Sequence, residues 1–343
     1  MRLGLNIGYW GSGQTTPLEL VIEAEKLGYD VVWAAEAWGS DVVTVLTWIA
    51  ARTEKIKVGA GVMQIPARTP AMTAMTAVTL NELSGGRFEL GLGVSGPQVV
   101  EGWHGLAYGK PLGKTREYVE ILRKIFARDE PVTHDGMHYA IPYQGDDATG
   151  LGKPLRLITH PTHDVPILIA SIGPKNVELT AEIADGWLPI FYSPMQAPKV
   201  YQPLLDTGFE KSGDPNKSST FDIAPSLSVV ITDDLEAGRR QMKPMAALYI
   251  GGMGAKGRNF YNTLACRYGY EEAAEKIQDL YLAGNKMAAT EAVPDDLVEQ
   301  INLIGPRKKV AEEIEIWKAA GVTTMNVAAT DIATLRTLAE LVL

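Results

Sequence analysis

Residues 56–94 read IKVGAGVMQIPARTPAMTAMTAVTLNELSGGRFELGLGV and hold one complete strand–helix–strand unit. Residues 56–63 and 87–94 are short apolar runs rich in valine, leucine and glycine, which predicts two buried strands. A Thr-Pro pair at 69–70 starts a helix between them, and a Ser-Gly-Gly run at 84–86 ends it. Strands joined through a helix pair in parallel, so the stretch predicts a parallel sheet covered by helices.

The same unit continues on both sides of this stretch. Strand starts near residues 2, 30, 56 and 87 lie about 30 residues apart, the length of one strand–helix unit. Eight strands in series, each followed by a helix, predict an α/β fold of the (β/α)8 TIM barrel type. A doubly wound sheet is the alternative and accounts less well for eight serial units. The remaining strands are predicted at 166–171, 186–191, 221–232 and 323–329.

Two insertions interrupt the regular pattern. Residues 130–165, after strand four, are rich in Pro, Gly, Asp and His and predict an excursion with a hairpin around 138–141. Residues 251–303, after strand seven, carry helical signals that include 294–304. Their glycine-rich start at 251–258 lacks the Lys-Ser/Thr pair of a P-loop and predicts a mobile loop, a candidate lid over the barrel mouth. We expect one barrel domain over residues 1–343.

The composition is that of an ordinary globular protein with an acidic surplus. Lysine and arginine number 32 against 41 aspartates and glutamates, so the formal net charge is −9. This balance argues against nucleic acid or an anionic membrane surface as the main partner. No apolar run reaches the roughly 18 residues of a membrane helix, and residues 1–6 read as a strand rather than a signal peptide.

Cysteine and histidine usage excludes two further kinds of site. Cys266 is the single cysteine, so an intrachain disulfide is excluded and we expect a cytoplasmic location. The five histidines form no HExxH pattern and have no cysteine partners, so no metal site is predicted.

Residues 91–96 match the GxGxxG pattern of dinucleotide-binding proteins, and Glu117 follows about 20 residues later. That fingerprint needs a helix to begin within the glycines, whereas residues 96–113 have the composition of a loop. The preferred interpretation keeps Gly91 and Gly93 in a barrel strand, where small residues let a flat ligand approach. A nicotinamide dehydrogenase stays a weak alternative.

In a barrel, the residues that follow the strands line the active site. Glu36 follows the second strand between aromatic residues, where loss of water would suit it to proton transfer. His104 lies in a loop after strand four and is a second proton-transfer candidate. Both residues have structural alternatives: a surface or capping glutamate, and a histidine that only forms hydrogen bonds. An aromatic substrate wall, or equally plain packing, is expected from Tyr9, Trp10, Trp38 and Tyr192.

Residues 172–175, Ile-Gly-Pro-Lys, form a strand-to-helix turn. A glycine turn into a proline-started helix leaves free backbone N–H groups at the positive end of the helix, which binds phosphate well. Lys175 would add a positive charge. An ordinary connecting turn is the alternative.

Several motifs together resemble the bacterial luciferase-like superfamily. They are SGGRFELGLG at 84–93, VGAGV at 58–62 with PARTP at 66–70, and ADGW at 184–187. The stretch GVSGPQVVEGWHG at 93–105 resembles the branch of that superfamily that depends on the deazaflavin coenzyme F420.

The resemblance implies a barrel with the deazaflavin at its carboxyl-end mouth and a non-proline cis peptide bond between Gly61 and Val62, against the ring. It places the cofactor phosphate at the turn after strand five. The cofactor-binding residues that it implies are Gly61, Val62, Met63, Gln64, Ser95, Gly96, Pro97, Gln98, Val99, Ser171, Ile172, Gly173, Pro174 and Lys175. Family members that oxidise glucose-6-phosphate carry a glutamate where this chain has Ser95-Gly96-Pro97, so that substrate is not expected.

The leading hypothesis is therefore an oxidoreductase that transfers a hydride between coenzyme F420 and an unidentified small organic substrate, with Glu36 or His104 managing one proton. An FMN-dependent luciferase-like monooxygenase and a non-catalytic deazaflavin-binding protein are the alternatives. The resemblance also implies a homodimer, formed through early helices such as 40–52 and 70–83.

Overall fold

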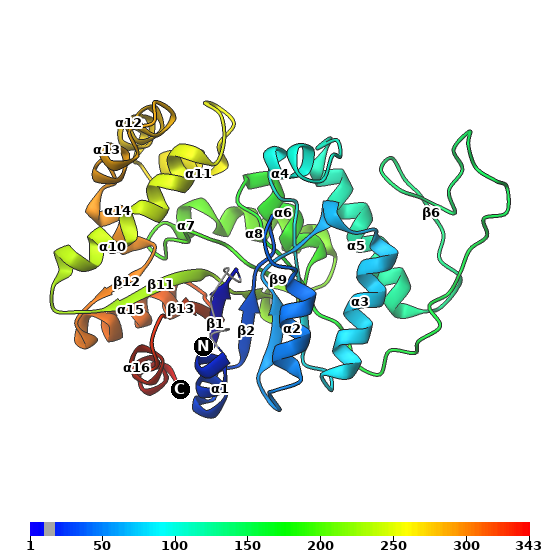
Figure 1. The fold of residues 1–343 in the computed structure, drawn as a ribbon, viewed down its shortest axis with the longest axis horizontal. Helices are drawn as coiled ribbons and strands as arrows, with labels where there is room; N and C mark the ends of the chain where they lie inside the picture. Colours follow the sequence, from blue (N-terminus) through cyan, green and yellow to red (C-terminus); the bar gives the residue numbers. More distant parts are fainter. Residues whose placement is uncertain (10–17) are drawn as a thin grey trace.

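The computed structural model describes residues 1–9 and 18–343. Its centre is a curled sheet in which all neighbouring strands run parallel (Figure 1). β4 (Met63–Gln64) lies off the main path of the sheet and pairs with β5. The other strands follow in this order: β10 (Asp222–Ile223), β9 (Gly186–Trp187), β8 (Ile167–Ile169), β5 (Phe88–Gly93), β3 (Lys57–Ala60), β2 (Val31–Ala34), β1 (Arg2–Gly8), β13 (Thr324–Ala328), β11 (Ser226–Ile231) and β12 (Leu303–Gly305).

The curl brings strands from distant positions in this order together. Only two residues separate β10 from β11, although they lie near opposite ends of the order. Beyond β9, the N–H of Ala224 donates to Trp187 O and the N–H of Ser226 donates to Pro189 O, both at 2.9 Å. Pro225, which lies between these two residues, accepts from the N–H of Asn326 in β13 at 3.0 Å. The segment 222–231 thus bonds to β9 on one side and to β13 on the other, which gives the barrel-like shape.

Helices cover the outer face of the sheet. The long ones are α1 (Leu18–Leu27), α2 (Val42–Ala50), α3 (Pro70–Leu83), α5 (Pro111–Ala127), α6 (Pro174–Ile183), α8 (Gln202–Ser212), α10 (Leu235–Ala247), α12 (Glu271–Leu282), α15 (Arg307–Ala319) and α16 (Ile332–Val342). Shorter ones are α4 (Pro97–Gly102), α7 (Ala197–Val200), α9 (Lys217–Thr220), α11 (Phe260–Arg267), α13 (Lys286–Glu291) and α14 (Asp295–Gln300). Within the described residues, none of these helices combines the length and the apolar character needed to cross a bilayer.

Two apolar cores result. The larger lies between strands and helices, and the smaller joins Val31, Trp33, Leu168, Leu188 and Ala224. The indole N–H of Trp33 donates to Asn326 Oδ1 at 2.8 Å, so the buried ring nitrogen is satisfied. A side chain at Gly59 would lie 2.4 Å from the Trp33 ring, which explains why this strand position is glycine.

The structure confirms most predicted elements and corrects three. The 130–165 excursion contains the antiparallel pair β6 (His134–Asp135) and β7 (Ala140–Ile141), so the predicted hairpin is present; in Figure 1 it projects away from the body. The predicted helix 294–304 is wrong in its second half, because residues 303–305 pair with β11 as β12. Residues 97–102 form a helix rather than a loop. Residues 248–252 form a π-helical turn, η2, so the glycine-rich segment is partly regular.

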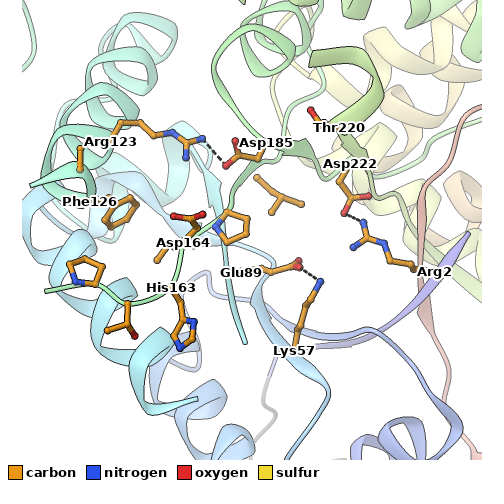
Figure 2. A pocket seen from close by; sticks show the side chains of 16 residues that line it. Arg2, Lys57, Glu89, Arg123, Phe126, His163, Asp164, Asp185, Thr220 and Asp222 are labelled. Atoms are coloured by element: carbon orange, nitrogen blue, oxygen red, sulfur yellow. Dashed lines mark hydrogen bonds and ion pairs between the residues drawn. The ribbon is translucent and has the colours of Figure 1, made fainter. Parts of the chain in front are cut away.

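At the amino end of the strands lies a cavity of about 750 Å³ lined by charged side chains (Figure 2). Arg2 pairs with Asp222 at 2.7 Å, Lys57 with Glu89 at 3.1 Å and Arg123 with Asp185 at 2.7 Å. The amino end of a barrel serves stability rather than chemistry, so the functional site is sought at the carboxyl ends.

Candidate active site

The segments after β1, β2, β4, β5, β8 and β9 meet at the carboxyl end of the sheet, since parallel strands end at one edge. This arrangement brings together the predicted residues Glu36, Gln64 and His104. It also adds Arg68 and Asp41, which the sequence reasoning did not select.

Glu36 is 8% exposed, and its carboxylate is fully engaged. Arg68 donates from Nη1 to Oε1 at 2.6 Å and from Nη2 to Oε2 at 2.9 Å. The backbone N–H groups of Gln64 and Val42 donate to the same oxygens at 3.2 and 3.3 Å. Arg68 also donates to Asp41 at 2.6 Å. Because Arg68 holds the Glu36 carboxylate in place, the hydrogen bond from Gln64 N–H to that carboxylate fixes the backbone at residue 64.

His104 is half-buried and contacts this network through Gln64. Its Nε2 lies 3.5 Å from Gln64 Oε1, and Gln64 Nε2 donates to Ala37 O at 2.7 Å. Burial of the Arg68 guanidinium opposes its charge, but hydrogen bonding and attraction from Glu36, with Asp41, outweigh this and raise the Arg68 pKa. Arg68 is the arginine of the PARTP motif at residues 66–70, shortly after a predicted strand. That position was the only sign in the sequence that Arg68 could belong to the site.

The peptide bond between Gly61 and Val62 is cis, as the family resemblance implied. A side chain at Gly93 on β5 would lie 2.6 Å from Val62 Cγ2, and one at Gly91 would lie 1.9 Å from the carbonyl oxygen of Ala60. Both glycines of the GxGxxG match lie in β5, and Ala60 and Val62 lie too close to these two positions for a larger side chain. Glu117, the acidic residue of that match, instead accepts from the backbone of the β6–β7 hairpin.

The loop after β5 includes Ser95, whose φ of 59° is in the left-handed region, and continues into α4. Gly96 is its N-cap, and Pro97, Gln98 and Val99 form its first turn. The helix lasts six residues, so these residues do not complete a dinucleotide-binding unit.

The turn after β8 has the predicted form. Gly173 caps α6 without a side-chain hydrogen bond, and Pro174 is its first residue. The N–H groups of Asn176 and Val177 donate to Gly173 O, whereas among the described residues that of Lys175 has no acceptor. Ser171 is buried, and its hydroxyl bonds to Thr180 at 2.8 Å, while Ile172 is half-buried and Lys175 exposed. The turn thus offers an N–H group and a lysine to an anion.

The predicted aromatic wall is partly corrected. Tyr9 and Trp38 are 54% and 59% exposed at strand ends, as a ligand-facing role requires. Trp10 lies outside the described residues. Tyr192 is buried, stacks on Tyr201 with ring centroids 5.3 Å apart, and donates to Ala320 O, so it belongs to the core and leaves the candidate set.

Three aromatic residues that sequence reasoning did not select lie at the mouth instead. Phe191, after β9, has its ring centroid 5.2 Å from that of Tyr249 and 5.9 Å from that of Tyr261. Tyr249 and Tyr261 are 4.7 Å apart. They come from η2 and α11 in the second insertion, so only the folded chain places them beside strand ends.

Comparison with known proteins agrees with this fold and shows the family. The model of the luciferase-like monooxygenase family matches residues 12–324, so the chain belongs to that family. A Mycobacterium tuberculosis protein, provisionally named a coenzyme F420-dependent oxidoreductase, is 48% identical over 100% of this chain and 99% of its own. The 5,10-methylenetetrahydromethanopterin reductase of Archaeoglobus fulgidus is 30% identical over 88% of this chain and 85% of its own.

Solved structures share the fold. The coenzyme F420-dependent tetrahydromethanopterin reductase of Methanopyrus kandleri superposes with a TM-score of 0.78, at 22% identity, over 99% of this chain and 97% of its own. The oxygenating constituent of 3,6-diketocamphane monooxygenase from Pseudomonas putida, in complex with FMN, has a TM-score of 0.68 at 19% identity, over 100% and 97%. The relative at 48% identity is thus named for coenzyme F420, whereas the FMN-bound structure is more distant in sequence, at 19% identity.

Proposed function

We propose that this protein is an oxidoreductase that transfers a hydride between coenzyme F420 and a small organic substrate. The observation that carries the proposal is the full-length likeness, at 48% identity, to a protein named for F420-dependent redox chemistry. Two features at the strand ends support it: Val62, which lies against β5, and the turn at Gly173, which begins α6 and could bind an anion.

The residues present fit this cofactor. Val62 lies against Gly93, where a Cβ atom would come within 2.6 Å of Val62 Cγ2, and Val62 would offer an apolar surface to the deazaflavin ring. The free N–H of Lys175 and its ammonium group would hold the phosphate. The proposed contacts also include Met63 and Gln64 after the cis bond, Ser95–Val99 after β5, and Ser171–Pro174. When bound, the deazaflavin supplies or accepts the hydride.

The protein must then hold one proton near the substrate. Both oxygens of Glu36 already accept hydrogen bonds from Arg68, which leaves Glu36 suited to holding the 61–64 segment in place. His104 is half-buried and has one nitrogen near Gln64, so we propose His104 for the proton and Glu36 for positioning.

Further parts of the proposal concern assembly. We propose a complete (β/α)8 barrel over residues 1–343, with insertions at 130–165 and 251–303. We also propose a cytoplasmic homodimer whose contacts involve α2 and α3, a small-molecule substrate, and no metal. The exposed Met72 and Met75 of α3 support a contact there.

Titration of the purified protein with F420 and with FMN, followed by cofactor fluorescence, tests the cofactor. We expect micromolar or tighter binding of F420 and binding of FMN at least about tenfold weaker. Tight FMN binding with none for F420 would instead favour the FMN-dependent monooxygenase. Binding of F420 without any redox change over a panel of ketones, aldehydes and alcohols would favour a non-catalytic binding protein.

A further inference from the structure

Four aromatic side chains gather at one side of the barrel mouth, and we call them the mouth aromatic set: Tyr9, Phe191, Tyr249 and Tyr261. The rings of Phe191, Tyr249 and Tyr261 meet edge-to-face, with interplanar angles of 79–83°. Tyr9 follows β1 at the same end of the sheet and lies close enough to Tyr249 and Tyr261 to contribute to the raised pKa of each phenol. Edge-to-face contacts among three rings make a stiff apolar surface.

The mouth aromatic set comes from strands and helices other than those that carry the proposed cofactor segments. Those segments follow β4, β5 and β8, which are neighbours in the sheet. Tyr9 follows β1, and Phe191 follows β9. Tyr249 in η2 and Tyr261 in α11 belong to the chain segment that follows β11. The two sets of segments touch at α11, because a side chain at Gly173 would lie 3.3 Å from the Phe260 ring. A substrate on this wall would therefore lie beside the cofactor.

The set is uncharged. Burial is the main cause that raises the pKa of Tyr249 to about 12 and that of Tyr261 further, and neighbouring tyrosines add to it. Burial alone raises the pKa of Tyr9. The amino-end cavity differs, because its three labelled arginine and lysine side chains each pair with a carboxylate (Figure 2).

The phenol groups are nevertheless available. Among the described residues, the hydroxyls of Tyr249 and Tyr261 have no hydrogen-bond partner, in contrast to the buried Tyr192, Tyr201 and Tyr268, whose hydroxyls are all bonded. A neutral phenol in an apolar wall can donate to one carbonyl oxygen or accept from one hydroxyl. An anionic ligand would lose its water against the four side chains of the mouth aromatic set, none of which carries a positive charge.

We propose, building on the proposed function, that the mouth aromatic set binds the substrate and selects an uncharged, mostly apolar carbonyl compound or the corresponding alcohol. The rings contact the hydrocarbon part, and Tyr249 or Tyr261 bonds to the single oxygen. Phosphorylated and carboxylated molecules are disfavoured at this site.

Matched probes test this selection on the F420-loaded protein. Cyclohexanone, cyclohexanol and cyclohexanecarboxylate share one ring and differ in charge, so their dissociation constants, measured by saturation-transfer NMR, isolate the effect of the carboxylate. We expect the two neutral probes to bind at least about tenfold more tightly than the anion. Equal or tighter binding of the carboxylate overturns the proposal.

Variants then locate the binding. Tyr261→Phe and Tyr249→Phe, made separately, each keep the ring and remove the hydroxyl. We expect cyclohexanone binding to weaken about fivefold in the variant that loses the bonding hydroxyl. Tyr261→Ala should weaken it by more than about tenfold. Tyr143→Phe, in the projecting excursion, is the control and should change nothing. Unchanged binding in all three mouth variants, each with a melting temperature near that of the wild type, would also overturn the proposal.

The same titrations separate this proposal from the proposed function. Tight F420 binding together with the wrong probe preference rejects only the mouth aromatic set as the substrate site. If F420 does not bind but FMN does, the proposed function fails, and the probe preference of the FMN-loaded protein still decides the substrate class.

Discussion

Arg68 donates to both carboxylate oxygens of Glu36, at 2.6 and 2.9 Å, and the same carboxylate accepts the backbone N–H of Gln64. The pair therefore connects the segment after β2 to the segment after the cis bond. Its side chains are only 17% and 6% exposed. A two-point ion pair in such a place holds geometry more strongly than a surface pair does.

The first prediction concerns this pair. Arg68→Ala leaves the Glu36 carboxylate buried without its cation, so we expect the free energy of unfolding to fall by about 3 kcal/mol. Arg68→Lys keeps the positive charge but cannot donate to both oxygens of Glu36 at once, and F420 affinity should fall about tenfold. Chemical denaturation and cofactor titration measure the two effects.

Its control is Lys308→Ala, which breaks an exposed ion pair with Glu312 and should cost less than about 1 kcal/mol. Glu36→Gln distinguishes a positioning role of Glu36 from a role in proton transfer. If Glu36 only holds the 61–64 segment in place, the variant should bind F420 more weakly and keep the pH dependence of kcat. Loss of one limb of that pH profile at unchanged affinity would assign the proton to Glu36.

The second prediction concerns Gly93. An added methyl group would stand 2.6 Å from Val62 Cγ2, so Gly93→Ala must move Val62 or its strand. We expect a destabilisation of about 1–3 kcal/mol, as for other overpacked sites, and weaker F420 binding. Gly102→Ala meets no atom within 4 Å and is the matched control. Equal F420 affinity in both variants would show that Val62 does not contact the cofactor.

The third prediction concerns the turn at Gly173. Lys175→Ala removes the exposed ammonium group beside the free N–H, and F420 affinity should fall about fivefold at low salt. The difference between wild type and variant should shrink as salt rises, because screening weakens exposed charges. Lys153→Ala, in the excursion, is a charge-matched control. A salt-independent difference would assign Lys175 a packing role.

The fourth prediction concerns acid pH and the β6–β7 hairpin. The Glu117 carboxylate accepts from the N–H groups of Met137, His138 and Tyr139 at 2.9–3.0 Å. Burial opposes its ionisation, but these N–H groups and His134 outweigh burial and lower its pKa below 4.5. Since the pKa is lower in the folded protein, this stabilisation is complete at neutral pH and is lost as the pH falls below 4.5 through the folded value.

Amide hydrogen exchange over residues 134–141 measures the effect. Exchange in the wild type should rise in that acid range relative to the rest of the chain. Glu117→Gln should raise it already at neutral pH, while Glu120→Gln, an exposed position on the same helix, should not. Acid-insensitive relative exchange in the wild type would show that the hairpin is held by other contacts.

The regular half of the fold was predictable because its signals are local. The Thr-Pro start and the Ser-Gly-Gly end of α3, and the apolar runs of β3 and β5, depend on neighbours in sequence. The same holds for the turn into α6. β12 was missed because residues 303–305 become a strand only by pairing with β11, a contact across about 70 residues that no local pattern encodes.

The site divides in the same way. Residues after strand ends could be selected from the sequence, because a parallel sheet places all those ends together, and Glu36, His104 and residues 172–175 were found by that rule. Arg68 escaped selection because its partner lies 32 residues away, and Tyr192 was selected wrongly because a strand-end position does not reveal which way a side chain points.

The amino-acid sequence by itself determined most of the strands and helices of the regular half, the family and the strand-end segments, since these follow from propensity, periodicity and motif. Only the tertiary structure decided that Glu36 forms an ion pair with Arg68 and that Tyr192 is buried in the core. It also decided that Tyr249 and Tyr261 pack against Phe191. The physical reason is that these outcomes depend on distances between segments far apart in the chain, which packing sets only once the sheet has curled.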